Sequence, residues 1–363
     1  MAFAFIKHDT KIDFIGKRHI AYAISILLLL VGLGSALWGN GLRMGIDFAG
    51  GVIVQVQFAQ PVEDEVLKKS LDIPELPGIS TQRFGEGARD YLLRFSSAEN
   101  TDAAALRTSV LAALAKAFPG NDVEIQRLEM VGPKVGDDLT NKALGALYYA
   151  TLLIAVYISG RFEQRWMAGV AMAAVLWGGM YLAGLTGLSM GWLVLVALGI
   201  TLVVCFVLKL NFALGALVGL IHDVFITVGL LSLMNVEIDL NVMAALLTLV
   251  GYSLNDTYDR LRENLRAAPK QPLASLINRS VNQTLSRTIL TSGTTFVATL
   301  ALYLLGGGVI HDFALTMLIG VFVGTASSIY VSSAVLLALG DTEFYVHQQE
   351  RPVYEKPGEH GIV

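Results

Sequence analysis

The chain has 363 residues, of which 54% are hydrophobic and 15% are charged, and its mean hydropathy is +0.59. Soluble domains carry about 25% charged residues, so this composition excludes a soluble globular protein and predicts a membrane protein. The net charge of −4 leaves no basic surface, which argues against nucleic acid as a partner. The single cysteine, Cys205, lies in an apolar run, and we interpret it as a small hydrophobic residue of a helix.

Apolar runs long enough to cross a bilayer recur along the chain. A membrane helix needs about 20 apolar residues, and eight runs approach or exceed this length. They cover residues 20–37, 143–159, 166–186, 190–208, 211–233, 240–257, 288–305 and 313–339. The first run is longer than the apolar core of about 7–15 residues in signal peptides, so we interpret it as a retained anchor. The fourth and fifth runs are separated by little more than Lys209–Asn211, so they could instead form a re-entrant pair.

Positive charge alternates between the connecting segments. Basic residues gather in the N-terminal tail, in 160–165 and in 258–287, whereas 187–189, 235–239 and 306–312 contain no Lys or Arg. Cytoplasmic loops are enriched in Lys and Arg. The sequence therefore predicts eight spans with both termini in the cytoplasm.

The segment 39–138 differs from the rest in composition, because runs with a period of two alternate with helical runs. Strands are predicted at Val52–Phe58, Ile79–Phe84, Tyr91–Phe95 and Val123–Leu128, and helices at Val62–Leu71 and Thr101–Phe118. The order β-α-β-β-α-β is that of a ferredoxin-like fold. We expect a compact domain on the outer face of the membrane, tethered by helices at both ends.

The predicted fold class is a polytopic α-helical membrane protein of about eight spans, with one extracytoplasmic α+β ferredoxin-like domain. The predicted parts are a cytoplasmic N-terminal tail (1–19), a first transmembrane helix (20–38), the extracytoplasmic domain (39–138), a transmembrane helical bundle (139–339) and a cytoplasmic C-terminal tail (340–363).

Enzyme signatures are missing from the sequence. It contains no His-Glu-x-x-His zinc motif, no phosphate-binding Gly-x-x-x-x-Gly-Lys-Ser/Thr loop and no nucleophile elbow. We therefore expect no catalytic residue, no metal site and no cofactor, and an intramembrane enzyme is the remotest alternative.

Ionisable groups inside the apolar runs are the candidate functional residues. A charge near the centre of a membrane helix costs about 2.5–3.5 kcal/mol on insertion scales and usually serves a function. Asp256 lies in the sixth run, Arg287 opens the seventh, and His222 and Asp223 lie near the middle of the fifth. The polar neighbours that could solvate these charges are Asn255, Thr257, Ser286 and Thr288.

Asp256 and Arg287 are predicted to lie at similar depth. At about 1.5 Å per residue, Asp256 is about 24 Å and Arg287 about 27 Å from the outer ends of their antiparallel runs. Pairing would lower the cost of burying both charges. Three other interpretations stay open: Arg287 could extend to the cytoplasmic surface, Asp256 could belong to a static pair, and His222–Asp223 could be a hydrogen bond between helices.

Six ordered segments resemble one known family. They are Gly45–Gly51, Val131–Gly136, His222–Val224, Gly251–Thr257, Asn282–Thr288 and Gly324–Ser328. Together they make the chain similar to the SecF subunits of the bacterial SecDF protein-export complex, which are related to the resistance-nodulation-division transporters. The resemblance covers nearly the whole chain.

The resemblance implies a multi-pass protein of the bacterial inner membrane, surrounded by lipid, with one domain on the periplasmic side. Its implied partners are a SecD chain, the SecYEG channel and the translocating preprotein, and its implied energy source is the proton-motive force, used late in export. The resemblance also implies that Asp256, in the Asn-Asp-Thr motif, and Arg287, in the Ser-Arg-Thr motif, serve proton coupling.

Two features depart from the family pattern. SecF subunits typically have six spans, and this chain has an additional pair near 166–208, an even number that preserves the downstream topology. The family also has three apolar residues after Asn-Asp-Thr, whereas here Tyr258 follows Thr257 directly. Asp259 then lies on the same helical face as Asp256, and the helix is about 4.5 Å shorter.

Our mechanistic hypothesis is that Asp256 takes up and releases protons on a path shared with a partner chain. Arg287 would adjust the pKa of Asp256, with His222 and Asp223 as further members of the relay, and the helices would then shift the outer domain. Two rival functions are a proton-coupled exporter of lipids or small molecules and a passive membrane scaffold.

Overall fold

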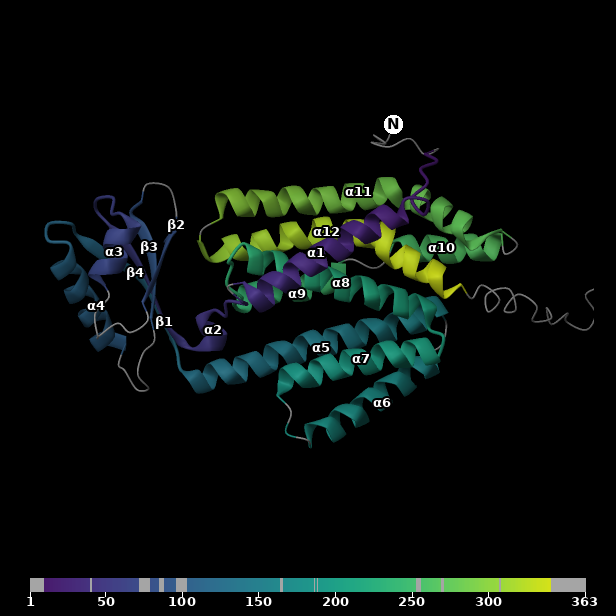
Figure 1. The fold of residues 1–363 in the computed structure, drawn as a ribbon, viewed down its shortest axis with the longest axis horizontal. Coiled ribbons are helices and arrows are strands. Elements are labelled where there is room, and N and C mark those ends of the chain that lie inside the picture. Colours follow the sequence, from purple (N-terminus) through teal and green to yellow (C-terminus); the bar gives the residue numbers. More distant parts are fainter. Residues whose placement is uncertain are drawn as a thin grey trace, which may run out of the picture.

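The computed structural model describes most of the chain. The described residues are 10–39, 41–71, 79–84, 88–95, 103–163, 166–185, 187, 189–252, 256–268, 271–306 and 308–340. Within these ranges the side chains of 82, 84, 162, 163, 180, 183, 184, 256, 257, 308 and 309 are not described. Figure 1 shows a small unit of strands and short helices at one end and a bundle of long helices, roughly parallel to the long axis, that forms the rest.

The small unit, called here the α+β unit, contains four strands and two helices. In chain order they are β1 (Gly51–Phe58), α3 (Asp64–Ser70), β2 (Ser80–Phe84), β3 (Asp90–Phe95), α4 (Ala103–Ala117) and β4 (Val123–Val131). The sheet order is β2-β3-β1-β4 and all neighbouring strands are antiparallel. The predicted strands and helices of this segment are confirmed, with ends that differ by a few residues.

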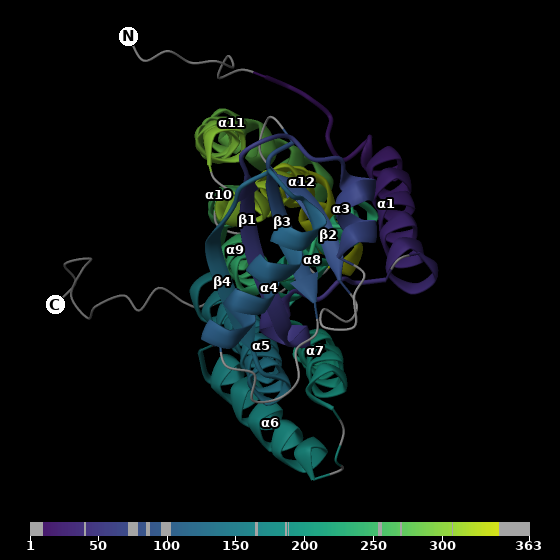
Figure 2. The same cartoon turned by 90° about the vertical axis from the view of Figure 1, so that its left-hand side faces the viewer.

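The sheet has one apolar and one more polar face, because successive side chains of a strand point to opposite sides. On β1, Val52, Val54, Val56 and Phe58 are at most 1% exposed, and they pack against α3 and α4 in one core. Figure 2 views this unit from its outer side, with α4 in front of the strands and the bundle behind them. The other face of the sheet is therefore turned toward the bundle.

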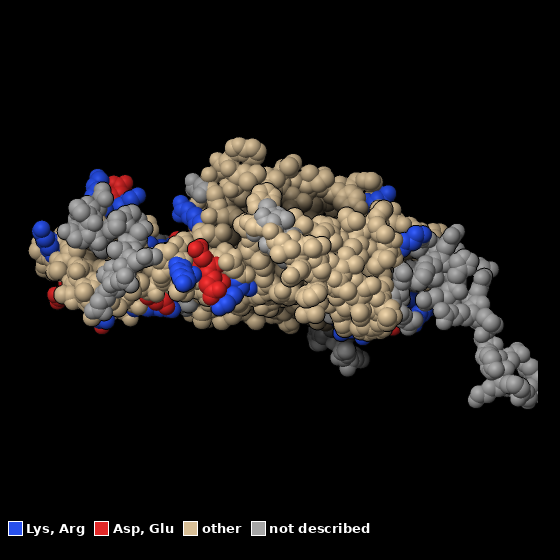
Figure 3. Space-filling view, turned by 90° about the horizontal axis from the view of Figure 1, so that it is seen from below, with Lys and Arg blue, Asp and Glu red and all other residues tan. Residues whose placement is uncertain are grey.

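The bundle contains nine helices among the described residues. They are α1 (Arg18–Trp38), α5 (Pro133–Glu163), α6 (Trp166–Gly184), α7 (Met190–Val207), α8 (Asn211–Leu233), α9 (Leu240–Tyr252), α10 (Asp256–Ala267), α11 (Leu273–Leu305) and α12 (Gly308–Leu339). A four-residue helix, α2 (Ile46–Ala49), lies between α1 and β1. Figure 3 shows charged side chains over the α+β unit and the adjoining end of the bundle, and again near the other end of the bundle, with a tan surface without Lys, Arg, Asp or Glu between them, as expected for a protein that crosses a membrane.

Six of the described helices are long and apolar enough to cross a membrane: α1, α5, α7, α8, α11 and α12. The apolar described part of α6, Trp166–Gly179, and helix α9 are shorter than this length. The sixth predicted run, 240–257, includes residues 253–255, which lie outside the described part of the chain, and α9 is its described part before them. Each of the eight predicted spans therefore coincides with a helix, and six of them reach the length of a span.

Helix α8 occupies the centre of the bundle, where it packs against α1, α5, α7 and α12. Glycines allow two of these close approaches. Gly32 of α1 and Gly229 of α8 face each other, and a Cβ on Gly229 would lie 2.6 Å from the Cα of Gly32. On another face of α8, Gly215 and Gly219 lie against Ser332 of α12. Helices α6 and α7 pack on the flank of α5, at the lower edge of Figure 1.

Candidate proton-transfer site

Asp223 is a buried carboxylic acid in α8, with 7% of its surface exposed. Its Oδ1 lies 2.9 Å from Nδ1 of His222, whose side chain is also largely buried. The Nε2 of His222 is buried and has no hydrogen-bond partner within the part of the chain that the structure describes. The structure therefore brings His222 and Asp223 together as a pair on one helix, and a hydrogen bond from this pair to another helix stays a prediction.

A small cavity lies beside Asp223. It is lined by Leu220, Asp223 and Val224 of α8, Leu249, Val250 and Tyr252 of α9, and Gly320 and Gly324 of α12. The Tyr252 hydroxyl is buried and has no hydrogen-bond partner among the described residues. The last described turn of α9 thus packs against the carboxyl-bearing part of α8, a contact that sequence reasoning did not identify.

Arg287 lies on the exposed face of α11, between the partly buried residues Ser286 and Thr288. The Thr291 hydroxyl, one turn further on, donates to the carbonyl oxygens of Arg287 at 3.0 Å and Thr288 at 3.1 Å. A cation on the outer surface of an apolar helix is costly in lipid. This position therefore suits a residue that meets another polar group within the membrane.

Asp256, the predicted partner of Arg287, is the first described residue of helix α10. The side chains of Asp256 and Thr257, and Asn255 as a whole, lie outside the described part of the structure. The pairing of Asp256 with Arg287 therefore stays a prediction. The next residues are described: Tyr258 is buried edge-to-face against Phe212, and the Asp259 carboxylate accepts from Arg161 of α5 at 3.1 Å.

Two asparagines of α11 bind the segment that precedes α1. Oδ1 of Asn278 accepts from the backbone N–H groups of Phe14 at 3.0 Å and Ile15 at 2.9 Å, and its Nδ2 donates to Asp13. Asn282, one turn later, accepts from the N–H of Ile12 and donates to its carbonyl oxygen. From the sequence, Asn282 is identified only as part of a motif. The signal that could have identified this contact is the spacing of four residues between Asn278 and Asn282, which places both on one face of a helix.

A second group of charges lies where the α+β unit meets the bundle. Arg94 of β3 forms an ion pair with Glu237, in the loop between α8 and α9, and both side chains are 19% exposed. Burial lowers the pKa of Arg94, while nearby Asp312 and Asp239 act in the opposite direction. Burial raises the pKa of Asp239, and the charges of Asp47 and Asp312 add to this effect. Sequence reasoning missed this group, since its members are distant in the chain.

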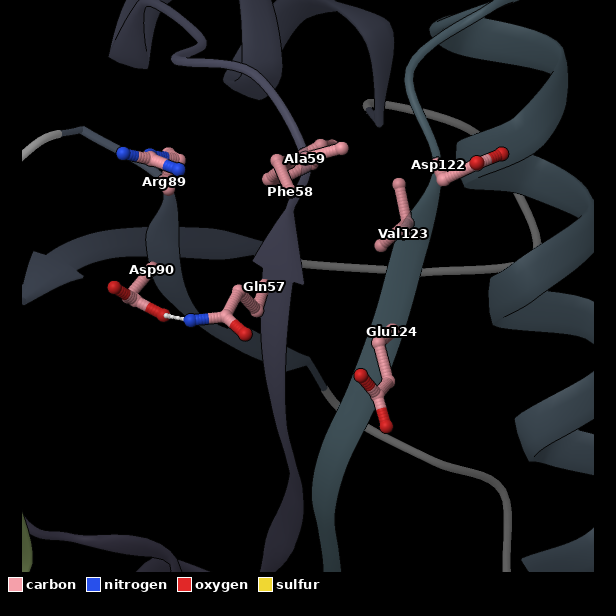
Figure 4. Close-up of a pocket in the computed structure, with 8 residues that line it drawn as sticks. All are labelled: Gln57, Phe58, Ala59, Arg89, Asp90, Asp122, Val123 and Glu124. Atoms are coloured by element: carbon pink, nitrogen blue, oxygen red, sulfur yellow. Dashed lines mark hydrogen bonds between the residues drawn. The ribbon is translucent and has the colours of Figure 1, made fainter.

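The α+β unit also has an open groove at the end of its sheet (Figure 4). It is lined by Gln57, Phe58, Ala59, Arg89, Asp90, Asp122, Val123 and Glu124. Figure 4 shows Gln57 and Asp90 directed toward each other, and the Gln57 amide donates to the Asp90 carboxylate at 2.8 Å. The groove is polar and solvent-facing, and it lies outside the helical bundle that holds the buried Asp223.

The comparisons with known proteins agree along the chain. The model of the SecD/SecF C-terminal region of protein export membrane proteins matches residues 110–188 and 183–342, and the SecD/SecF GG motif matches residues 35–62. The protein translocase subunit SecF of Magnetococcus marinus is 41% identical over 335 residues, which cover 91% of this chain and 92% of that protein. The chain belongs to the SecF family.

Other SecF relatives are similarly close along their full length. SecF of Escherichia coli O157:H7 is 35% identical over 350 residues, covering 95% of this chain and 93% of that protein. SecF of Calditerrivibrio nitroreducens is 35% identical, covering 91% and 95%. These relatives are protein translocase subunits, so this chain has an accessory role in Sec protein translocation, and its apolar helices make it a multi-pass membrane protein.

The fold is also that of a solved structure, the translocon-associated membrane protein SecDF from Thermus thermophilus. The TM-score is 0.67 at 30% sequence identity, and the match covers 92% of this chain. The chain spans 39% of the length of that SecDF chain. The two matched pieces of the C-terminal family model meet at 183–188, between α6 and α7, within the hairpin that the sequence predicts to be additional.

Proposed function

We propose that this SecF chain uses the proton-motive force to assist a late step of protein export across the bacterial inner membrane. The observation that carries the proposal is the buried Asp223 carboxyl in the middle of a membrane-length helix, paired with His222 and bordering a cavity. A group of this kind is expensive in lipid and is retained where ions or protons pass. Asp256 and Arg287 complete the proposed relay.

The energetics permit such a role. Each proton that crosses about 100 mV releases about 2.3 kcal/mol, which shifts a two-state equilibrium by about fiftyfold. Loss of charge on Asp256 or Asp223 would change the packing that the surrounding helices prefer. The helices would then move the α+β unit, which would act on the exported chain.

The proposed topology has eight spans, with α6 and α9 as the two short ones, and both termini in the cytoplasm. The segment 39–138 would be a ferredoxin-like domain on the periplasmic side, and 139–339 the transmembrane bundle. The tails 1–19 and 340–363 would be cytoplasmic. The alternation of basic loops supports this orientation, and the antiparallel sheet order β2-β3-β1-β4 supports the domain assignment.

The proposed partners are a SecD chain, the SecYEG channel, the translocating preprotein and the surrounding lipid. The likeness to a SecDF structure described as translocon-associated supports the first two.

The test is export of a preprotein into inner-membrane vesicles with and without a proton gradient. We expect Asp256→Asn to assemble normally and to lose the stimulation that the gradient gives, and Asp223→Asn to lose most of it. The matched control is Asp138→Asn, an exposed carboxylate that pairs with Lys142 on the surface of α5. If the gradient stimulates export equally in both Asp variants, the proposal is wrong and the alternative of a passive membrane scaffold remains. Transport of lipids or small molecules by vesicles that lack SecYEG would instead favour the alternative of a proton-coupled exporter.

A further inference from the structure

The segment from Arg43 to Gly51, called here the joint segment, connects α1 to β1 and lies against the start of α9. The backbone N–H of Gly45 donates to the carbonyl oxygen of Ile238 at 2.8 Å, and the N–H of Ile238 donates to the carbonyl oxygen of Arg43 at 2.8 Å. These two bonds form a short parallel bridge between Met44 and Ile238. A Cβ on Gly45 would lie 3.0 Å from the Cβ of Asp239, so glycine permits this close approach.

Asp47 of the joint segment binds the first turn of α9. Its Oδ2 accepts from the backbone N–H of Leu240 at 3.0 Å, and Oδ1 of Asp239 accepts from the N–H of Val242 at 2.8 Å. Two of the N–H groups that a helix leaves unpaired at its start are thus satisfied by carboxylates, which also suit the positive end of the helix dipole. One of these carboxylates belongs to the α+β side of the molecule, 193 residues away in the chain.

The rest of the joint segment is held equally firmly. The Phe48 side chain is 8% exposed in a core cluster with Ile238, Val242 and Leu246. On its other side α2 packs against the first turns of α5, where Gly136 leaves room for the Phe48 carbonyl group. Short range contacts therefore fix α2 between the starts of α5 and α9.

Two glycines then turn the chain directly into the sheet. Gly50 has φ +71° and Gly51 has φ +129°, values that side chains with a Cβ rarely adopt. Gly51 is already the first residue of β1, the strand that pairs with both β3 and β4. No flexible linker separates α2 from the sheet, since one residue lies between Ala49 and β1.

The sheet reaches the same loop a second time through Arg94, which pairs with Glu237 from the bundle-facing side of β3. The loop before α9 is thus bound to the α+β unit at two places, by the joint segment and by this ion pair. The far end of α9 lies beside Asp223, since Leu249, Val250 and Tyr252 line the cavity there. With 13 residues, α9 spans about 20 Å between the two places.

We propose that the joint segment is a rigid coupling between α9 and the sheet, with Asp47 as the positioning residue, so that a displacement of α9 at Asp223 is passed to the α+β unit. The proposal rests on the proposed function for the source of that displacement. It gives the glycine and aspartate residues of this segment a mechanical role: the glycines permit contact and turning, Asp47 holds α9, and Phe48 anchors α2.

The first test measures the joint itself, independently of any gradient. Amide hydrogen exchange is followed in the full chain, assembled in lipid, for residues 238–243. Asp47→Ala should increase exchange there about fivefold, as expected for the loss of one capping bond. Asp47→Asn keeps an acceptor oxygen and should stay near the natural chain, as should Asp138→Ala. Unchanged exchange in Asp47→Ala overturns the proposal.

The second test measures the coupling. Spin labels at Thr108→Cys, exposed on α4, and Leu305→Cys, at the exposed outer end of α11, report the distance between the α+β unit and the bundle in vesicles. The gradient should change this distance in the otherwise natural chain, in Asp47→Asn and in Asp138→Ala, and not in Asp47→Ala. An equal change in Asp47→Ala overturns the joint. If the gradient does not change the distance even in the otherwise natural chain, the proposed function is contradicted. The amide hydrogen exchange of the first test then decides by itself whether Asp47 holds the start of α9.

A third measurement separates a rigid joint from a latch that opens. Arg94→Cys and Glu237→Cys are joined by a short bifunctional thiol reagent, with the buried Cys205 replaced by alanine. A rigid joint keeps the gradient-dependent distance change after cross-linking. Loss of that change on cross-linking, with recovery when the reagent is cleaved, overturns the proposal because the contact would then have to open.

Discussion

Asp239 shows how one half-buried carboxyl at the junction makes stability depend on pH. Burial and its neighbours Asp47 and Asp312 raise its pKa above the model-compound value of 3.8. The folded chain therefore holds the proton more tightly than the unfolded chain, which stabilises the fold fully below pH 3.8. This contribution is lost as the pH rises through the raised pKa of the folded state.

Asp239→Asn should remove this pH dependence and keep the cap on α9, because an amide oxygen can still accept from Val242. We expect the variant to melt higher than the natural chain at neutral pH, with the difference vanishing near pH 4. Thermal unfolding in detergent at several pH values measures this. A difference that grows toward acid pH would mean that Asp239 is stabilised in its charged form.

Asp13, which binds Asn278 near the start of α11, shows the opposite pH dependence. The N–H of Gly16 and the amide of Asn278 lower the pKa of Asp13, so this carboxylate stabilises the fold above its unfolded pKa and stops doing so as the pH falls through the lowered folded value. Asn278→Ala should weaken the binding of residues 12–15, at about 0.5–1.5 kcal/mol per lost hydrogen bond. Faster amide exchange at Phe14 and Ile15 would report the change.

The control for this variant is Arg279→Ala, the exposed neighbour on the same turn of α11. It should leave exchange at Phe14 and Ile15 unchanged. Equal effects of the two substitutions would show that the segment before α1 depends on the charge or helicity of α11 rather than on the Asn278 amide.

At the scale of elements, the crossing of α1 and α8 depends on two glycines. A Cβ on Gly229 would lie 2.6 Å from the Cα of Gly32, closer than backbone atoms can approach without a shift. Gly229→Ala should therefore push α1 outward and destabilise the bundle by about 1–3 kcal/mol. It should also stretch the bond of 3.0 Å between the Ser35 and Ser232 hydroxyls, just beyond the crossing.

Gly34→Ala is the control substitution, on α1 two residues after Gly32, where nothing lies within 4 Å of the added Cβ. It should be neutral or slightly stabilising, since alanine favours helix more than glycine. Unfolding in mixed micelles compares the two. Similar losses in both variants would mean that helix propensity or lipid contact, not the crossing with α8, sets the role of these glycines.

The sequence predicts those helices and strands whose formation depends on a local pattern of residues. In lipid the backbone must satisfy its own hydrogen bonds, so apolar runs such as 211–233 predict helices with the observed ends. The alternation of residues with a period of two predicts β1, because successive side chains of a strand point to opposite faces of the sheet. The start of α9 at Leu240 also agrees with the predicted run, and the end of that run, 253–257, falls mostly on residues that the structure does not describe.

In the candidate site, too, local patterns are predictable from the sequence and contacts between distant residues are not. The charge of His222 and Asp223 within an apolar run marks them as candidates, whereas their hydrogen bond to each other is seen only in the structure, since neighbouring side chains of a helix do not usually face each other. The contact between Asp47 and Leu240 joins residues 193 positions apart, and single-sequence patterns contain no signal for it. The predicted pair of Asp256 with Arg287 stays a prediction, because the Asp256 side chain lies outside the described residues.

At the scale of the whole molecule, the hairpin of α6 and α7, predicted to be additional to the family fold, packs on the flank of the bundle. Helices α5 and α8, which it separates in the chain, contact each other directly. Two of its buried side chains, Cys205 and Met172, contact each other within the hairpin, with their sulfur atoms 3.5 Å apart. Removing it would expose an apolar surface of α5 to lipid, which costs little because lipid is itself apolar.

Deletion of residues 166–209 should therefore leave a chain that inserts, assembles and keeps its response to the proton gradient, because α5 would still end and α8 would still begin on the same side of the membrane. Deleting α6 alone, residues 166–189, should abolish function, since an odd number of removed helices inverts every later span. Export assays and the accessibility of a cysteine at the exposed position Leu305 test both. Loss of assembly in the first deletion, with the His222–Asp223 helix misplaced, would show that the hairpin is part of the structural core.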